Sequence, residues 1–488
     1  MPERSRLSAA SARWLSLVAI LTAGLLVTFF RIGDPSLWLD EAYTWWFSRM
    51  GFTEMLYAAR VDGVNPPLYY ILSWMVAGMF GTGEAALRGL SGIAQLAAIV
   101  GLFLLGRQIA GAAAGVAAAT LWALHPMALS YARDARPYAL AGALGAFLVW
   151  LFLRLREHLR QSELIAAAGL MAAGLLTHYF FFVLVAALLL LSTFELRQRP
   201  RLFRYWSLAT LGALVPLGLW LLWFFALPEP SLGIGWIDSP TLADLPATAW
   251  NLLGGYGGVN APGTTALGLG AAAALVALLR LGPRRDETAS VLAAGVLVPL
   301  LAVWTLSQRR PVYVDRYFLV LLPVAIALVG AGVAQAGQWL SHRHRLGSWG
   351  SNLPLLILLA CALPAALRVH RDQAFAKEDW RQLTGVIAPG GAIASPIWRS
   401  EPEILLPLAY YLGPDVPVLE SPTAADCREG CWYVTRKPYT ATHAFGQSVQ
   451  EPDRPWEAVA PEGCQELDAW RSETGVAALW IVCGLTGG

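Results

Sequence analysis

The chain has 488 residues, of which 56% are hydrophobic and only 14% are charged. Its mean hydropathy is +0.51, whereas soluble globular proteins have about a quarter of their residues charged. These values exclude a soluble protein and indicate a polytopic membrane protein. The formal net charge of +2 is too small to indicate a nucleic-acid partner, and the arginines form short clusters between apolar runs, as topology signals do.

The first apolar run, from about 14 to 30, follows Arg4, Arg6 and Arg13. No small-residue cleavage site follows it, so we interpret it as an uncleaved signal anchor. If the N-terminal arginines stay inside, this helix runs outward and places the next segment on the outer face of the membrane.

That next segment, SLWLDEAYTWWFSRM at 36–50, has two adjacent carboxylates, Asp40 and Glu41, among tryptophans and a tyrosine. Acidic side chains near hydrocarbon are costly unless they are paired or used, and aromatic rings of this kind settle at headgroup depth. The pattern predicts a functional site where lipid meets water. The alternative is that Asp40 only caps a short helix.

The apolar stretch 66–80, PPLYYILSWMVAGMF, is shorter than the roughly 20 residues that a spanning helix needs. We predict a helix in the outer interface, because a full span would move the later arginine clusters to the outer face. After it the charge pattern predicts regular alternation, which with the first run makes about eleven spans. The further predicted spans are 88–106, 112–131, 138–153, 164–177, 180–194, 208–225, 267–281, 291–306, 317–335 and 355–367.

The C-terminal part, about 370–488, has ordinary hydrophobicity and contains the chain's only lysines, Lys377 and Lys437. We therefore predict two domains, a membrane domain at 1–369 and a small outer α/β domain at 370–488. The expected helices are 379–387 and 403–411, and the expected strands are 392–395, 416–419, 432–435 and 477–482.

Four of the five cysteines lie in this C-terminal part: Cys427, Cys431, Cys464 and Cys483. An even number of cysteines suits disulfides in an oxidising compartment, and the pairing stays open. Without a companion histidine the Cys-x-x-x-Cys spacing is weak support for zinc.

Under this topology the charged and polar groups without an obvious role fall at the outer ends of spans. Charges at such depth need counter-charges or a ligand, which favours one shared site. Each also has a simpler explanation: a loop ion pair at 133–136, an interfacial hydrogen bond for His178, or a headgroup anchor for Arg316 and Tyr317. The set is Asp40, Glu41, Asp62, Arg133, Asp134, Arg136, His178, Tyr179, Arg309, Arg310, Asp315 and Arg316.

The motifs LWLDEAYT, NPPLYY, SYARDARPYAL, LLTHYF, DRYFLVLLP and KEDWRQL resemble those of bacterial members of glycosyltransferase family 39. These enzymes are kin of protein O-mannosyltransferases and lipid A aminoarabinose transferases in the GT-C class. The resemblance covers the membrane part and the start of the outer domain. It implies a polytopic α-helical GT-C-like protein with interfacial helices in the first outer loop. This chain departs from several relatives at Asn65, where they carry His or Lys.

The resemblance implies transfer of a sugar, hexosyl or pentosyl, from a polyprenyl-phosphate donor to an acceptor hydroxyl, with inversion. The acceptor is a glycan, a lipid or a protein, and the reaction takes place outside the bacterial cytoplasmic (inner) membrane. A hydroxyl needs a carboxylate to take its proton, and we predict Asp40 as that base, with Asp134 or Asp62 as alternatives. Glu41 is predicted to orient the acceptor or to hold Arg or His partners.

The leaving phosphate needs charge stabilisation, which forked guanidinium donors supply, so we predict that Arg133, Arg136 and Arg316 bind it. Asp62, Asn65, His178, Tyr179, Tyr313 and Asp315 are predicted to line the pocket. No cofactor and no metal are predicted, with a divalent cation held by Glu41, Asp134 and His178 as the alternative. The glycine-rich outer loop 228–263 either closes over a substrate or is a slack connector.

Two other functions are weighed. A transporter usually places its polar groups near the bilayer midplane within repeated halves, whereas here they crowd one rim and no repeat is visible. A non-catalytic partner in envelope assembly would use its outer domain as the binding surface.

Overall fold

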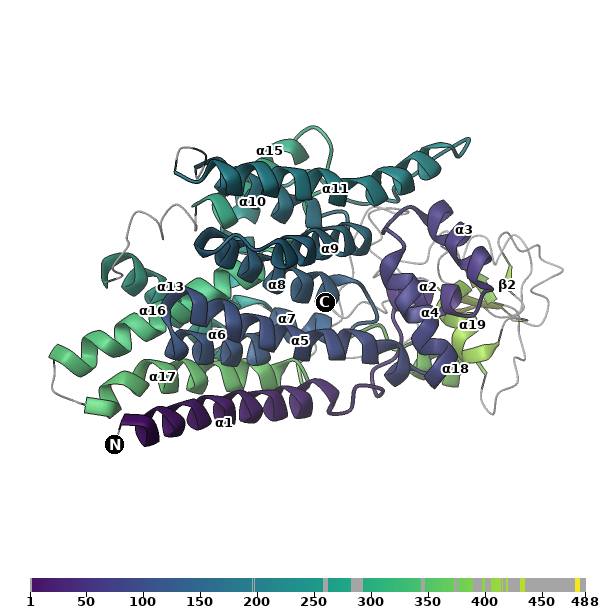
Figure 1. Ribbon diagram of the computed structural model, residues 1–488. Helices are drawn as coiled ribbons and strands as arrows, with labels where there is room; N and C mark the ends of the chain where they lie inside the picture. The colour runs from purple at the N-terminus through teal and green to yellow at the C-terminus, as the bar shows by residue number, and fades with distance from the viewer. Residues whose placement is uncertain are drawn as a thin grey trace. The chain divides into compact units, whose positions relative to one another are not determined.

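The computed structural model describes residues 2–194, 196, 198–257, 262–281, 293–343, 347–372, 375, 377–388, 397–399, 405–413, 415, 418–419, 431–434 and 479–482. The chain divides into two compact units (Figure 1). The membrane unit comprises residues 1–32 and 47–372, and the second unit comprises 33–46 and 373–488. The segment 33–46, predicted within the domain 1–369, therefore groups with the C-terminal residues.

The membrane unit is a helical bundle, because its apolar runs satisfy every backbone hydrogen bond internally only as helices. Its first half contains α1 (Pro2–Phe29), α3 (Phe52–Asp62), α4 (Leu68–Phe80), α5 (Glu84–Ala110), α6 (Ala112–Leu124), α7 (Pro126–Ala132), α8 (Tyr138–Glu157), α9 (Gln161–Thr177), α10 (Phe181–Phe194) and α11 (Pro200–Phe225). Its second half contains α12 (Asp244–Trp250), η1 (Asn251–Gly255), α13 (Pro262–Leu281), η2 (Ala293–Leu297), α15 (Val298–Ser307), η3 (Asp315–Val320), α16 (Leu322–Arg343) and α17 (Gly347–Arg368).

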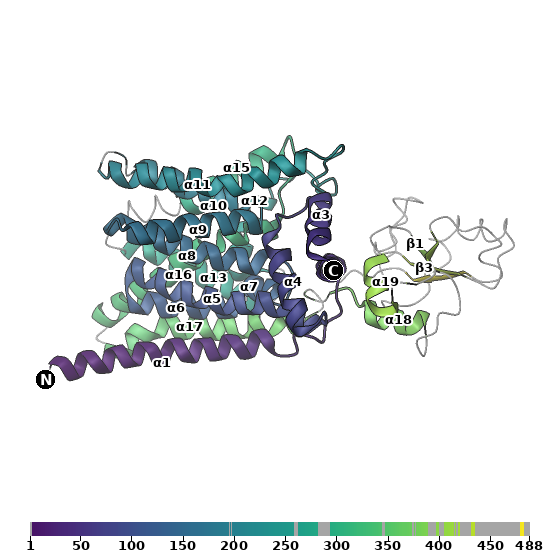
Figure 2. The ribbon, with the colours of Figure 1, turned by 45° about the vertical axis from the view of Figure 1, so that its right-hand side comes forward.

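The helices α5, α8, α9 and α11 pack in that order (Figure 2). On the other side α6 and α16 pack against α5, and α13 and α17 pack against α16. The apolar windows of α5, α8 and α16 are 61%, 67% and 67% buried, so these three helices form the centre. Small residues permit this approach. A Cβ placed on Gly330 would lie 2.8 Å from the Ala114 carbonyl oxygen, so α16 and α6 meet through bare backbone.

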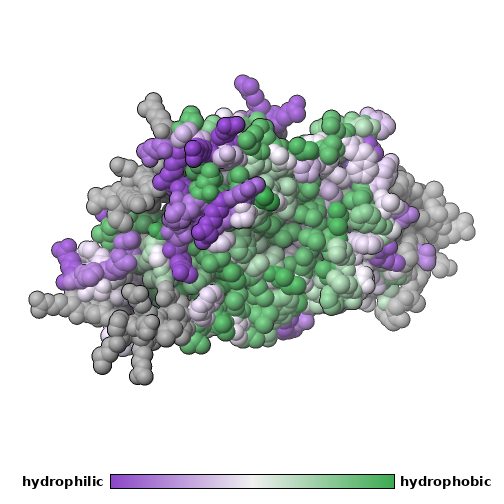
Figure 3. Space-filling view, viewed as in Figure 1, coloured by the Kyte–Doolittle hydropathy of each residue, from purple (hydrophilic) through white to green (hydrophobic). Residues whose placement is uncertain are grey.

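The outer helices expose the apolar surface that a membrane would cover. The windows of α11 and α17 are each only 28% buried, and Leu219 and Leu222 on α11 are 63% and 72% exposed. Figure 3 shows hydrophobic side chains over the flank of the bundle and hydrophilic ones gathered toward one end. Burial of these residues in lipid restores the hydrophobic free energy that exposure to water would cost.

By length and composition, six helices of the described chain can cross a membrane: α5, α8, α11, α13, α16 and α17. The pair α6 and α7 makes a seventh if it is counted as one broken span. Four other predicted spans are shorter apolar helices, Trp14–Phe29, Gln161–Thr177, Phe181–Phe194 and Gly295–Ser307. The polytopic helical fold is confirmed, and the count of about eleven resolves into six or seven full-length spans and four short ones.

The predicted span at 112–131 is broken into two helices. Its helices α6 and α7 are bent by 57° at His125, the residue before Pro126. Proline has no backbone N–H and disfavours the helical conformation of the residue before it, so the helix breaks there and restarts with Pro126 in its first turn.

The second unit contains α2 (Leu39–Ser48, shared with the membrane unit), α18 (Trp380–Ile387) and α19 (Leu405–Leu412). Its strands are β1 (Ile397–Arg399), β2 (Val418–Leu419), β3 (Cys431–Val434) and β4 (Leu479–Val482). They form a parallel sheet in the order β2-β1-β3-β4. The two predicted helices and three of the four predicted strands match these elements. The strand predicted at 392–395 lies outside the described residues, as do Cys427, Cys464, Cys483 and the side chain of Cys431.

Candidate active site

Aromatic rings from three distant segments meet at one end of the membrane unit. The ring of Tyr138, at the start of α8, lies 5.4 Å from that of His178, which follows α9. Tyr317, in η3, lies 5.1 Å from His178 and 6.4 Å from Tyr138, centroid to centroid. Because α8 packs against both α9 and η3, the start of α8, the end of α9 and η3 lie together here.

Two further tyrosines extend this group. Tyr131, in α7, lies 5.0 Å from the ring of Tyr138, and its hydroxyl is 3.0 Å from the hydroxyl of Tyr256. Tyr256 follows η1, where Gly254 has a φ of 106° that side-chain-bearing residues rarely adopt. We refer to Tyr131, Tyr138, Tyr256 and Tyr317 as the tyrosine cluster.

Two of the predicted arginines, Arg136 and Arg316, act electrostatically on His178. Burial, followed by the positive charges of Arg136 and Arg316, lowers the pKa of His178 to about 3. The backbone N–H of Phe180 donates to His178 Nδ1 at 3.1 Å. His178 is therefore a neutral imidazole with its proton on Nε2, and the positive charge around it comes from the two guanidinium groups.

Arg136 and Arg316 are held in different ways. Arg136 is 4% exposed, and its carbonyl accepts a bond from Ser91 Oγ at 3.2 Å, which Tyr69 contacts in turn at 2.9 Å. The guanidinium of Arg316 lies over the ring of Trp236 at 5.2 Å, a cation–π contact.

Arg133, also predicted to bind phosphate, has its donors engaged at the end of α1. Its Nη1 donates to the carbonyls of Thr28 and Phe30 at 2.7 Å each, and its Nη2 donates to Arg31 at 3.2 Å. Arg88, fully buried, donates to the Ile32 carbonyl at 2.9 Å. Cations stabilise a helix C-terminus, where carbonyls lack partners. Arg133 thus closes α1, and the phosphate hypothesis rests on Arg136 and Arg316.

Asp315 and Tyr313 fasten the outer loop. Asp315 accepts from Thr248 Oγ1 at 2.5 Å and from Asn251 Nδ2 at 2.6 Å. The hydroxyl of Tyr313 donates to Thr248 Oγ1 at 2.9 Å, and burial raises its pKa to about 12. These bonds join η3 to α12 and η1, so the loop that was predicted to be mobile or slack is tied at its centre.

Asp134 is 3% exposed and lies within electrostatic reach of Tyr256. Burial raises the pKa of the Tyr256 hydroxyl, the bond to Tyr131 and the charge of Arg316 oppose this, and Asp315 and Asp134 add to it. The alternative base Asp134 is thus beside the tyrosine cluster.

The remaining predicted pocket residues lie nearer α3, α4 and α11. Asp62 Oδ2 accepts from the Val64 amide at 3.4 Å, and Asn65 Nδ2 donates to the Tyr70 hydroxyl at 3.5 Å. The hydroxyl of Tyr179 accepts from Trp220 Nε1 at 3.1 Å, and burial followed by the charge of Asp62 raises its pKa.

The predicted acids of the second unit have separate environments. Asp40 and Glu41 lie in the first turn of α2, where the helix dipole favours negative charge. Asp40 is half-buried, whereas Glu41 is fully buried and its Oε1 lies 2.9 Å from Lys377 Nζ. Glu41 therefore forms an ion pair with Lys377, a partner that the sequence analysis did not name.

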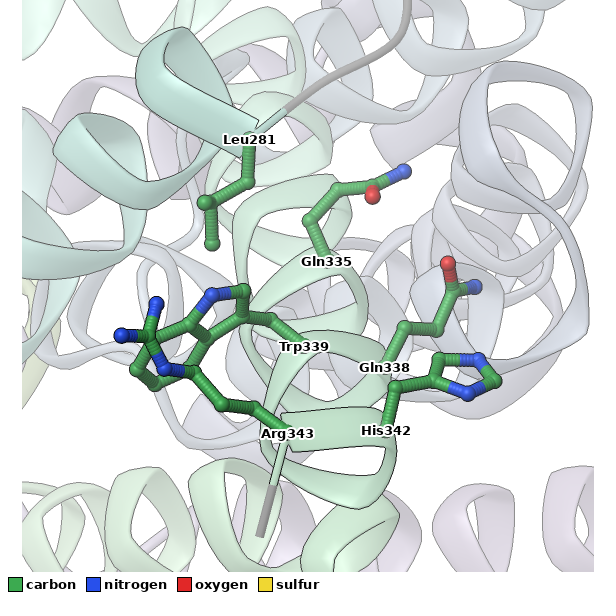
Figure 4. Close-up of a pocket in the computed structure, with 6 residues that line it drawn as sticks. All are labelled: Leu281, Gln335, Gln338, Trp339, His342 and Arg343. Carbon is green, nitrogen blue, oxygen red and sulfur yellow. The ribbon is translucent and has the colours of Figure 1, made fainter.

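Metal ligands do not gather in the part of the chain that the structure describes, where no group of three or more His, Cys, Asp or Glu side chains is found. A cavity of about 400 Å³ lies between α13 and α16, lined by Leu281, Gln335, Gln338, Trp339, His342 and Arg343 (Figure 4). It lies toward the end of α16 opposite to η3, and the stretch of α16 from Leu322 to Gln335 alone rises about 20 Å, so the cavity is separate from the tyrosine cluster.

Known proteins share both a sequence pattern and this fold. Residues 64–223 match the model of the dolichyl-phosphate-mannose-protein mannosyltransferase family. ArnT from Cupriavidus metallidurans in the apo state aligns over 91% of this chain and 90% of its own, with a TM-score of 0.57 at 14% identity. The chain therefore shares the fold of ArnT over nearly its whole length, and residues 64–223 share the sequence pattern of the mannosyltransferase family. No curated protein sequence matches it significantly.

Two ligand-bound structures also share the GT-C fold. ArnT bound to undecaprenyl phosphate aligns over 83% of this chain and 85% of its own, with a TM-score of 0.57 at 15% identity. The archaeal oligosaccharyltransferase AglB from Archaeoglobus fulgidus, in complex with an inhibitory peptide and a dolichol-phosphate, aligns over 84% of this chain and 64% of its own. Its TM-score is 0.52 at 14% identity.

The tyrosine cluster was not predicted from the sequence. Tyr131 and Tyr138 flank the RDAR motif that was singled out, and Tyr317 follows Arg316, so proximity to predicted residues was the available signal. Tyr256 had only its glycine-rich context, which indicated a turn and not a contact.

Proposed function

We propose that this protein transfers a sugar from a polyprenyl-phosphate donor to an acceptor hydroxyl. The observation that carries the proposal is the convergence of Arg136 and Arg316 on His178 and the tyrosine cluster, at one end of an apolar bundle. A lipid phosphate with its tail in the membrane presents its charge at that depth. The fold shared with undecaprenyl-phosphate-bound ArnT supports the same donor class.

The proposed reaction is a single displacement with inversion. The acceptor oxygen forms a bond to the anomeric carbon as the bond from that carbon to the phosphate oxygen breaks. The phosphate oxygen keeps the electron pair and leaves as the free lipid phosphate, while the acceptor proton passes to the Asp40 carboxylate. Arg136 and Arg316 stabilise the charge on the leaving phosphate, so no proton donor is needed there.

The tyrosine cluster has the chemistry of a sugar-binding surface. The cluster of tyrosine hydroxyls beside Arg316 supplies donors and acceptors for a sugar, and the aromatic faces suit its C–H surface. We propose no cofactor, since two guanidinium groups supply the charge for the phosphate. We place the reaction on the extracytoplasmic side of a bacterial cytoplasmic (inner) membrane, with the second unit on that side and a glycan, lipid or protein as acceptor.

The deciding experiment incubates purified protein with a panel of polyprenyl-phosphate hexoses and pentoses and measures released lipid phosphate. We expect release by the wild type and a loss of at least about 100-fold in Asp40→Asn. The matched control is Asp34→Asn, an exposed carboxyl in the same segment, which should stay active.

Unchanged release by Asp40→Asn, with an unchanged unfolding temperature, would reject Asp40 as the base. Failure of the wild type to release lipid phosphate from any donor would reject the transferase, and movement of intact donor across proteoliposome membranes would support a transporter instead.

A further inference from the structure

The second unit contains three buried charged groups that the proposed reaction does not use. Glu41 is fully buried, Glu378 is 7% exposed, and the side chain of Lys377 is 16% exposed. Charged side chains are seldom buried without a partner, because desolvation costs several kilocalories per mole for each ion. These three therefore need a structural or functional reason to be where they are.

The hydrogen bonds and the ion pair of these three residues involve the first turn of α2 and the residue before it. The Leu39 amide donates to Glu378 Oε2 at 3.3 Å, and Lys377 Nζ lies 2.9 Å from Glu41 Oε1. The second oxygen of Glu41 accepts from the Trp38 amide at 3.4 Å. Leu39, immediately before Asp40, is thus bonded to Glu378, and Glu41, immediately after it, is paired with Lys377.

The 377–380 segment is itself rigidly placed. Trp380 is fully buried, and its Nε1 donates to Glu378 Oε2 at 2.8 Å. Asp379 caps α18 by accepting from the Gln382 amide at 3.1 Å. Glu378 therefore presents its carboxylate from the start of a packed, capped helix, and Trp380 is a core residue.

The residues before α2 are bonded to the same unit. The hydroxyl of Tyr411, on α19, accepts from the Leu37 amide at 2.8 Å and from Ser36 Oγ at 2.9 Å. Arg381 Nη1 donates to the Asp34 carbonyl at 2.7 Å. The backbone leading to Asp40 is thus held by bonds to α18 and α19.

We propose that Lys377 and Glu378 are positioning residues for Asp40. Glu378 accepts one of the N–H groups that a helix start leaves unpaired, and Lys377 neutralises Glu41, so the first turn of α2 keeps one geometry. This inference rests on the proposed function, in which Asp40 is the base. It also gives Glu41 a definite role, that of a counter-ion.

A role in positioning has a different kinetic signature from a role in folding. Glu378→Ala and Lys377→Met should lower kcat for lipid phosphate release by about 10- to 100-fold, with little change in KM for the donor. Glu378→Gln keeps an oxygen for the Leu39 amide and should recover most of kcat. The double variant Glu41→Lys with Lys377→Glu restores opposite charges and should be more active than either single variant.

The matched control is Glu163→Gln, which breaks the ion pair between Arg154 and Glu163 in the membrane unit at 2.5 Å. It should change the unfolding temperature without changing kcat. Equal kcat in wild type and Glu378→Ala would overturn the inference, as would a kcat loss that Glu378→Gln and the charge swap both fail to recover.

Hydrogen exchange gives a second readout that does not depend on turnover. In Glu378→Ala the amides at 37–43 should exchange faster than in wild type, with α18 unchanged. If the wild type releases no lipid phosphate, the proposed function fails, while unchanged exchange at 37–43 would by itself overturn the positioning role.

Discussion

Individual residues of the membrane unit differ in what holds them, and this difference separates candidate ligands from structural groups. Arg133 gives three bonds to carbonyls at the end of α1, whereas Arg136 and Arg316 exert their charge on His178. All three were equivalent in the sequence, because each is an arginine beside an outer helix end. Only the three-dimensional contacts distinguish the arginine that closes α1 from the two whose charge acts on His178.

The first residue-scale prediction concerns Arg136. Arg136→Gln should lower kcat/KM for lipid phosphate release by about 100- to 1,000-fold, because a charged donor to the leaving phosphate is lost. Arg133→Gln is the matched comparison and should mainly lower the unfolding temperature. Full activity in Arg136→Gln, measured by the same release assay, would remove this residue from the phosphate site.

The second residue-scale prediction concerns acid stability. The pKa of His178 is about 3 in the folded chain against an ordinary 6.5. The unfolded chain therefore binds a proton below pH 6.5 that the folded chain does not bind until about pH 3. Stability contributed by the neutral imidazole is complete above pH 6.5 and is lost on acidification, by up to about 1.4 kcal/mol per pH unit.

His178→Gln removes this titration and keeps an acceptor for the Phe180 amide. Unfolding temperatures of wild type and variant, measured from pH 7.5 to pH 4.5, should diverge, with the wild type falling faster. Parallel curves would show that His178 does not titrate in this way.

Among the elements, the loop between α11 and α13 departs most from its expected character. Its glycines suggested a lid or a slack connector, but α12 and η1 form within it and Asp315 bonds to both. Trp304 Nε1 also donates to the Thr241 carbonyl at 2.8 Å. The loop is therefore a positioned element that delivers Tyr256 to the tyrosine cluster.

At this scale we predict the effect of Asp315→Asn. Loss of the charged acceptor should destabilise the protein by about 1–3 kcal/mol and speed hydrogen exchange at 248–257. Asp244→Asn is the control, because the Asp244 carboxylate accepts from Thr241 within the loop, at 2.6 and 2.8 Å. Equal exchange at 248–257 in the two variants would show that Asp315 does not anchor η1.

The broken span at His125 illustrates what local sequence rules could have found. Pro126 is visible in the sequence, and a proline within an apolar run predicts an interruption. One continuous span at 112–131 already agreed with the distribution of the arginines, so the interruption at Pro126 was not predicted. The angle of 57° and the packing of α7 against η1 depend on the neighbouring helices.

At the scale of the whole molecule, the helices place the tyrosine cluster and the turn between α8 and α9 at opposite ends of the bundle. α8 has 20 residues from Tyr138 to Glu157, a rise of about 30 Å, which matches a hydrocarbon core. Arg309, before η3, and Leu159, in the turn after α8, are exposed markers of the two ends.

We predict that a membrane-impermeant thiol reagent labels Arg309→Cys in intact cells and Leu159→Cys only after permeabilisation. The parent chain, with its native cysteines, is the background control. Labelling of both positions from the same side would contradict the topology, and exchange of the two patterns would place the tyrosine cluster on the cytoplasmic side.

The sequence by itself determined the class of this protein, its helices and the residue types of its candidate site. Apolar runs, arginine-flanked ends and short motifs are local features, and the free energy of membrane burial acts on each of them separately. The tertiary structure decided which of these residues meet: Tyr138 with His178 and Tyr317, Asp315 with Thr248, and Leu39 with Glu378 across 339 positions. Such pairings depend on how elements far apart in the sequence pack together. Local sequence patterns therefore do not reveal them.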